Sequence, residues 1–171
     1  AAHIPVHLGS MPLSVQAAIE HFKEDLHPGD AVILNDPFRG GTHLPDITIV
    51  SPVFYQEAHG QQLVGFVASR AHHADVGGMT PGSMPVGREL FQEGLIIPPV
   101  KLVRTGKVEQ AILDMILANV RTPHERSGDL MAQLAANRRG TTRLLDMVER
   151  YGRVEIQTSM NQLLAYTERL T

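Results

Sequence analysis

The chain has 171 residues, which is the length of about one domain and enough to bury a hydrophobic core. Its formal net charge is −3 and its only notable basic cluster is the pair Arg138-Arg139, so the composition excludes the electrostatic footprint of a nucleic-acid-binding protein. The absence of cysteine excludes a disulfide framework or thiolate zinc site and fits a cytoplasmic location, and no apolar run predicts a transmembrane helix.

The first half of the chain predicts one helix and three strands. Residues 1–12 contain prolines and a glycine and are expected to form a loop, after which Ser14 can cap a helix. The apolar run 31–34 is typical of a buried strand, and the β-branched residues of 47–54 predict a second strand. Residues 63–69 predict a third strand, which can pair with the second as a hairpin.

The second half changes from loop to helix. Residues 76–100 are rich in proline and glycine, and a loop of that length in a compact domain is usually functional or disordered. After Gly106, apolar residues recur at helical spacing. They predict a helix over 108–119, one or two helices around Gly140 and a last helix over 156–164.

Together these elements predict a mixed α/β (α+β) fold in one segment, residues 1–171. Residues 1–105 are expected to be rich in strands and loops, and residues 106–171 are expected to be helical. We expect the segment to belong to a larger, multi-layer protein. Its most polar motifs fall near the ends of predicted strands, where a rigid sheet positions side chains and loops leave them reachable.

Two short runs of sequence are typical of a metal site. One is Gly40-Gly41-Thr42-His43-Leu44-Pro45-Asp46, and the other is Arg70-Ala71-His72-His73-Ala74-Asp75-Val76-Gly77-Gly78. Each places histidine and aspartate within a few residues of each other. In a chain without cysteine, these are the natural ligands for a divalent cation. The sequence therefore predicts a metal site if the two runs meet in space.

Spacing narrows the choice of ligands but leaves it open. His43 and Asp46 are three residues apart, close enough to share one ion. His72 and His73 would point to opposite faces of a strand, so we expect at most one of them to bind the metal. Strict alternation puts His73 on the same side as Asp75, which favours His73. The alternative is that these histidines are turn or surface residues.

Other polar residues have both a structural and a functional interpretation. Asn35-Asp36-Pro37 favours a turn, although Asp36 could instead orient a ligand histidine. Gly40-Gly41-Thr42 could approach an anion, but it lacks the lysine and following helix of a phosphate-binding loop. Glu93 lies in an apolar loop, where a carboxylate could act as a general acid or base; the alternative is a surface glutamate.

The order of these motifs closely resembles the hydantoinase B/oxoprolinase family, and the match covers essentially the whole chain. Members of that family are several hundred residues long, so the resemblance implies that residues 1–171 are a partial segment. The residues that carry it are His3 to Pro12, Pro28-Gly29-Asp30, Asn35-Asp36-Pro37, the two His/Asp runs, Pro81 to Met84, Glu93-Gly94-Leu95, Ile97 to Leu102, Asn119-Val120-Arg121 and Gly128-Asp129-Leu130.

The resemblance implies an ATP-dependent enzyme in two parts. The family includes the B-type subunits of N-methylhydantoinases, the C-terminal half of 5-oxoprolinase and relatives of the large subunits of acetone and acetophenone carboxylases. A hydantoinase A-type subunit or domain would bind ATP and phosphorylate the carbonyl oxygen of a small cyclic amide. The B-type part would then complete ring opening. We therefore expect a hetero-oligomer in which the partner holds ATP, which agrees with the missing phosphate-binding loop.

The resemblance also implies a divalent metal, with manganese, zinc or iron as the expected ion. Carried over by motif, the metal ligands are His43, Asp46 and His73. The expected catalytic residues are Asp75, His72 and Glu93, of which the first two could also bind the metal or orient its ligands. Such an ion would polarise the activated carbonyl or lower the pKa of a water molecule.

The leading hypothesis is a catalytic B-type part of an ATP-dependent cyclic amidohydrolase, a hydrolase that opens a hydantoin or 5-oxoproline-like ring. A subunit of a ketone carboxylase is the alternative within the family, and the residues covered do not separate the two. A third alternative is a non-catalytic structural or interaction segment, whose helical part would form an interface with another subunit.

Overall fold

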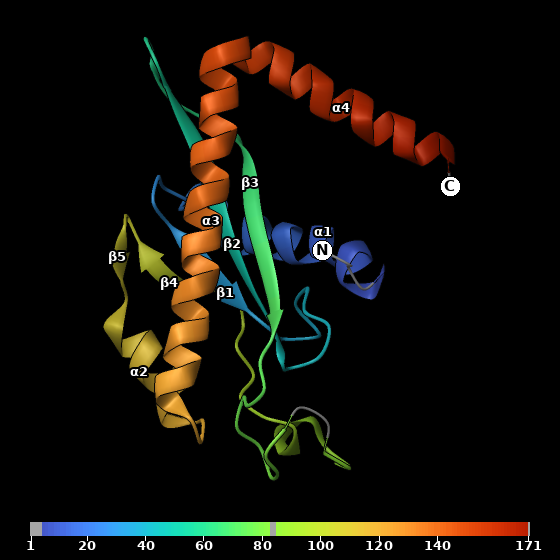
Figure 1. The fold of residues 1–171 in the computed structure, drawn as a ribbon, viewed down its shortest axis with the longest axis vertical. Coiled ribbons are helices and arrows are strands. Elements are labelled where there is room, and N and C mark those ends of the chain that lie inside the picture. Colours follow the sequence, from blue (N-terminus) through green and yellow to red (C-terminus); the bar gives the residue numbers. More distant parts are fainter. Residues whose placement is uncertain (1–4, 83–84, 171) are drawn as a thin grey trace.

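The computed structural model describes residues 5–82 and 85–170. Its architecture is mixed α+β, as predicted, with an antiparallel sheet formed mainly by the N-terminal part and long helices in the C-terminal part (Figure 1). The elements in chain order are α1 (Pro5–Phe22), β1 (Ala31–Leu34), β2 (Asp46–Glu57), β3 (Gly60–His72), η1 (Leu90–Gln92), β4 (Val100–Arg104), β5 (Lys107–Val108), α2 (Gln110–Ala118), α3 (Pro123–Tyr151) and α4 (Arg153–Leu170).

The strands in the described residues form one sheet in the order β3-β2-β1-β4-β5, and every neighbouring pair is antiparallel. Helix α1 packs on one face, against β2 and β3, while α2 and α3 cover the opposite face. Figure 1 shows α3 running along the length of the sheet. The sheet therefore separates an α1 side from an α3 side.

Strand β1 is buried on both sides of the sheet. Ala31 and Ile33 belong to the core beneath α2 and α3, whereas Val32 and Leu34 belong to the core beneath α1. Alternate side chains of a strand point to opposite faces, so a strand covered on both faces requires an unbroken apolar run. The strand predicted at 31–34 is confirmed for this reason.

Strands β2 and β3 form the predicted hairpin, and both are longer than expected. Their pairing contains one register shift, at which β3 carries an extra residue, Val64. Such a bulge changes which residues of the two strands lie opposite each other beyond it. As a consequence, Asp46 at the start of β2 lies directly opposite His72 at the end of β3.

Helix α3 runs unbroken through Gly140, where the sequence left one or two helices open. A Cβ atom at Gly140 would lie 2.6 Å from Cγ1 of Val67 in β3. Glycine in a helix interior costs about 1 kcal/mol relative to alanine. Here it allows the helix to approach the hairpin closely, which the sequence pattern alone does not reveal.

The structure differs from the predicted elements at two further places. Helix α1 begins at Pro5, so most of the residues expected to form a loop are helical. Pro5 stands at the start of the helix, where the missing N–H of proline needs no partner, but Pro12 lies inside it, where proline normally kinks or ends a helix. The strands β4 and β5 were not predicted. The expected irregular stretch before β4 is confirmed: its described residues contain only the short 3-10 helix η1.

Helix α4 packs its first turn against the hairpin and then extends away from the sheet (Figure 1). Ile156 lies in a small core with Val53 and Val64, while Leu163 and Leu164 further along are exposed. None of the helices in the described part of the chain combines the length and apolar character that crossing a bilayer requires.

Candidate metal centre

Asp46 is the centre of a polar cluster on the α1 side of the sheet. Its side chain is 1% exposed, yet its Oδ2 lies 2.7 Å from Nδ1 of His43 and 2.8 Å from Nε2 of His7. Its Oδ1 lies 3.1 Å from Nδ1 of His72. The hydroxyl of Thr42 donates a hydrogen bond of 2.7 Å to Oδ2. Four polar side chains from three parts of the chain therefore converge on one buried carboxylate.

The loop before β2 is held in place by a glycine and a buried asparagine. A Cβ atom at Gly41 would collide with the backbone carbonyl of Asn35, so only glycine fits this approach. The Asn35 amide donates to the carbonyls of Leu44 and Leu95, at 2.8 and 2.9 Å, and its oxygen accepts the N–H of Ile97 at 2.6 Å. These bonds fix the loop that presents the first His/Asp run.

The pairing of β2 with β3 explains why His72 reaches the cluster. Residues directly opposite each other in an antiparallel pair project their side chains from the same face. Asp46 pairs with His72, and the next pair on that face is Thr48 with Arg70. The two His/Asp runs therefore meet in space, as a shared metal site requires.

His43, Asp46 and His72 form a group whose ligand atoms all lie within 4.8 Å of one another. We call these three residues the donor group. Two imidazole nitrogens and a carboxylate suit a borderline or hard divalent ion, so the chemistry of the residues fits a metal. The side chains of His43 and His72 are 38% and 42% exposed, which leaves the donor group reachable from solvent.

The surroundings of Asp46 favour its ionised form. Burial by itself would raise the pKa of this carboxyl group, but the hydrogen bond from Thr42 and the nearby imidazoles of His43, His72 and His7 outweigh it. The pKa of Asp46 is therefore lowered from its ordinary value. A carboxylate that is ionised across the physiological range is the form that binds a cation.

His73 does not meet the donor group as the alternation argument expected, because it points to the α3 side of the sheet. It is 2% exposed, and its Nε2 donates to Oε1 of Gln133 at 2.9 Å. The Nε2 of Gln133 in turn donates to the carbonyl of Ile47 at 3.0 Å. Burial lowers the pKa of His73 despite the hydrogen bond to Gln133. The structure thus brings His72, and not His73, to Asp46.

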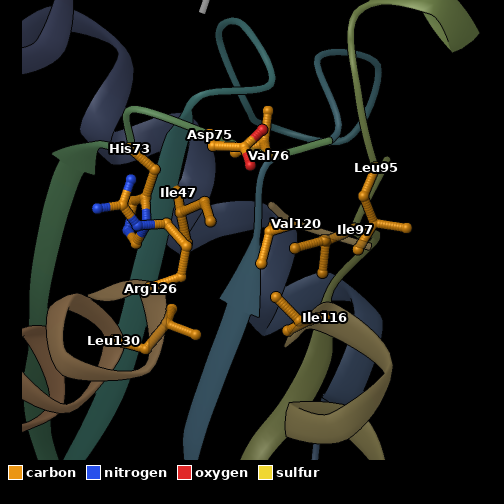
Figure 2. Close-up of a pocket in the computed structure, with 10 residues that line it drawn as sticks. All are labelled: Ile47, His73, Asp75, Val76, Leu95, Ile97, Ile116, Val120, Arg126 and Leu130. Carbon is orange, nitrogen blue, oxygen red and sulfur yellow. The ribbon is translucent and has the colours of Figure 1, made fainter. Parts of the chain in front are cut away.

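A small cavity on the α3 side lies beside His73 (Figure 2). Figure 2 shows Arg126 next to His73 on one wall, while Ile97, Ile116 and other apolar side chains close the opposite wall. The cavity has a volume of about 10 Å³, enough for about one water molecule. It is therefore too small to be a substrate site.

Asp75, an expected catalytic residue, is buried in a network that joins two loops. Its carboxylate accepts the N–H of Gly77 at 3.0 Å and both the backbone N–H and the Nη1 of Arg121, at 2.5 and 3.0 Å. Burial would raise its pKa, but these hydrogen bonds and the Arg121 charge lower it. The contacts explain Asp75 as a connection to the loop before α3, and its catalytic role stays a prediction.

The two other candidate carboxylates have no contact with the donor group among the residues described. The backbone N–H of Glu93 donates to the carbonyl of Leu90 and its side chain is half-buried. Its acid–base role stays a prediction. The Oδ1 of Asp36 accepts the N–H of Phe38 at 2.9 Å, which is the turn interpretation of this residue.

His7 is the site residue that sequence reasoning missed. It falls within a segment expected to form a loop, and nothing in its spacing relates it to Asp46. The one signal that could have found it is its residue type, since histidine is a common metal ligand. Only the packing of α1 on the sheet brings it there.

A sequence profile of the hydantoinase B/oxoprolinase family matches residues 1–171, and the chain belongs to this family. It is 40% identical to 5-oxoprolinase 1 of Arabidopsis thaliana over 94% of its own length and 13% of the relative. It is 31% identical to the B-type subunit of a putative D-/L-hydantoinase of Pseudomonas sp. (strain NS671), over 97% of this chain and 28% of the relative.

Two solved structures are similar to this chain in both fold and sequence. One is the ATP-dependent caprolactamase of Pseudomonas jessenii, with a TM-score of 0.85, 32% identity and coverage of 94% of this chain and 27% of that protein. The other is a nucleotide-free acetone carboxylase, with a TM-score of 0.77, 26% identity and coverage of 86% and 19%. The chain spans between 12% and 30% of the length of the curated relatives it matches.

Proposed function

We propose that this chain supplies the metal-binding part of an ATP-dependent enzyme that opens a cyclic amide. The observation that carries the proposal is the convergence of His43, Asp46 and His72 at a solvent-reachable end of the hairpin. The relatives add the class of reaction, since they include oxoprolinases, part of a hydantoinase and a caprolactamase, all of which are named for cyclic amide substrates.

The site combines one buried carboxylate with two partly exposed histidines. Asp46 is buried and ionised, and Thr42 holds its Oδ2, so the carboxylate provides a fixed negative charge. His43 and His72 carry the exposed edges, where a substrate can approach. A divalent ion bound there, with manganese, zinc or iron as candidates, would supply a Lewis acid for the carbonyl or phosphoryl oxygen of an activated amide.

The proposal includes a division of labour between two proteins or domains. The described residues contain no phosphate-binding loop with its lysine, and the glycines before His43 instead pack against Asn35 and α1. We therefore assign ATP to a hydantoinase A-type partner, in keeping with the hydantoinase relative, whose name marks it as one subunit of a larger enzyme. The partner would phosphorylate the substrate, and Asp75 and Glu93 remain candidates for roles in ring opening.

A ketone carboxylase is the second candidate function. It is favoured by one observation, the similarity to an acetone carboxylase in fold and sequence. The acetone carboxylase is less similar to this chain than the caprolactamase is, in TM-score, identity and coverage. We therefore place the cyclic amidohydrolase first.

The test uses the intact protein purified together with its A-type partner. Elemental analysis is expected to find one divalent ion per chain, and ATP-dependent ring opening is expected with 5-oxoproline, hydantoin or caprolactam. Carboxylation of acetone with bicarbonate and ATP, without ring opening, would instead select the second candidate. His72→Ala is expected to lower metal content and turnover together, with His59→Ala, an exposed residue of the hairpin turn, as the control. Unchanged metal content in His72→Ala and His43→Ala would contradict the site.

A further inference from the structure

A third histidine reaches the same carboxylate from an element outside both His/Asp runs. His7 lies in α1, and its Nε2 is 2.8 Å from Oδ2 of Asp46, nearly the same distance as Nδ1 of His43 at 2.7 Å. The side chain of His7 is 23% exposed, so the imidazole is partly enclosed between the helix and the sheet. Its position depends on how α1 is held.

Arg70 fastens α1 to the strand that carries His72. Arg70 lies two residues before His72 in β3 and on the same face of the sheet. Its Nε donates to the hydroxyl of Thr48 at 2.8 Å, and its two Nη groups donate to the hydroxyls of Ser10 and Ser14 in α1, the latter at 2.6 Å. One guanidinium therefore ties the helix to both strands of the hairpin beside the donor group.

The same helix also touches the loop that carries His43. Ser14 is fully buried and donates to the carbonyl oxygen of Gly40. A Cβ atom at Gly40 would lie 2.6 Å from the carbonyl oxygen of Leu13, and Gly40 has φ +86°, a conformation that glycine adopts without strain. The packing that positions His43 is thus the packing that positions His7.

We propose that His7 is a fourth protein ligand of the ion held by the donor group. This inference rests on the proposed function, because it requires that an ion binds. An imidazole nitrogen is a good ligand for manganese, zinc or iron, and Nε2 of His7 already faces the carboxylate shared by the other donors. Four protein ligands would close a tetrahedral ion, so an ion of higher coordination number would be needed to leave a position for substrate.

The first experiment measures the affinity of the intact protein for cobalt(II) in the wild type and in His7→Ala. Loss of a direct ligand is expected to lower the affinity by more than the ~10–100-fold that follows loss of a residue that only orients a ligand. The visible spectrum of cobalt(II) is expected to change as well, because the ligand set changes. His21→Ala is the matched control, since His21 is an exposed histidine of the same helix, and its affinity and spectrum are expected to equal those of the wild type.

A second measurement needs no substitution and therefore does not depend on the folding of a variant. X-ray absorption fine structure of the wild-type protein loaded with cobalt(II) counts the imidazole ligands, and three are expected. Two imidazoles, or a His7→Ala variant with wild-type affinity and spectrum, would overturn the assignment of His7 while leaving the proposed function intact. A wild-type protein that binds no divalent ion would overturn the proposed function and this inference together.

Discussion

Two neighbouring histidines lie on opposite sides of the sheet, in different surroundings. On the α1 side, His72 is 42% exposed and lies beside the ionised carboxylate of Asp46. On the α3 side, His73 is 2% exposed and donates to Gln133 in the core. His73 is the first residue after β3, and its N–H still donates to the carbonyl of Pro45 at 2.8 Å, so the alternation of side chains between the two faces continues through it.

The two sides of the sheet therefore have different roles. The α1 side leaves ligand atoms reachable around one fixed charge. On the α3 side, buried amides of the helix bond to the sheet instead: Gln133 and Asn137, one helical turn apart, donate to the carbonyls of Ile47 and Ile49, each at 3.0 Å. Substitutions on the α1 side should therefore change ion binding, and those on the α3 side should change stability.

The largest effect is expected for Asp46→Asn. Removing the only carboxylate of the donor group removes the charge that attracts a cation, so the affinity for a divalent ion should fall by more than ~100-fold and turnover should be lost. Elemental analysis of the purified variant measures the loss. Asp146→Asn, which changes an exposed carboxylate of α3, is the control. Wild-type metal content in Asp46→Asn would remove this residue from the site.

The pair His72→Ala and His73→Ala tests the comparison directly. We expect His72→Ala to lower the metal affinity by more than the ~10–100-fold that follows loss of an orienting residue, and to change the free energy of unfolding by less than ~0.5 kcal/mol, since its side chain is partly exposed. We expect His73→Ala to keep the ion and to lose about 1–3 kcal/mol, because it leaves the Gln133 amide oxygen buried without its donor. Metal titration and urea unfolding measure the two quantities. The opposite outcome would restore His73 as the ligand that alternation alone favours.

Gln133→Leu tests the role of the α3 side from the helix rather than from the strand. The substitution removes the acceptor of His73 and the donor to the Ile47 carbonyl, so the free energy of unfolding should fall by about 1–3 kcal/mol. Metal affinity should remain that of the wild type, because α3 contributes nothing to the donor group. Urea unfolding of the variant is compared with that of Gln162→Leu, an exposed glutamine of α4. A loss of the ion without a loss of stability would contradict the division between the two sides.

The smallest effect is a pH dependence at Asp75. Its folded-state pKa is lowered below the ordinary 3.8, so the folded state favours the charged form and this contribution is present above pH 3.8. It is lost as the pH falls through the lower, folded-state pKa. The stability difference between the wild type and Asp75→Asn, about 1 kcal/mol, should therefore be constant near neutral pH and shrink below pH 3.8. Unfolding curves at several pH values measure it, and a difference that grows on acidification would reverse the sign.

Much of the fold follows from local pattern. The apolar run 31–34, the hairpin strands and the helical spacing after Gly106 were each predictable, because alternation and helical periodicity are properties of neighbouring residues. Strand β4 was missed because its place in the sheet depends on pairing with β1, which is distant in sequence. The first turns of α1 were not predicted, because its prolines and glycine are typical of a loop. Packing on the sheet stabilises the helix there.

The site was predictable in its residue types and in part of its membership. From the residues alone, two His/Asp runs flank predicted strands, and His43 and Asp46 are close enough in the chain to share an ion. The family also follows from the residues, because ordered motifs along the whole chain carry that information. These properties depend on residue identity and local spacing alone.

Which histidines meet Asp46 depends on the tertiary structure. If the register at the hairpin turn continued along the strands with no bulge at Val64, Asp46 would lie opposite Ala71, and His72 would face α3. A shift of one residue moves every side chain beyond it to the other face of the sheet. His7 depends in the same way on the packing of α1. Long-range register and helix packing have no local signature, and they select the residues that hold the ion.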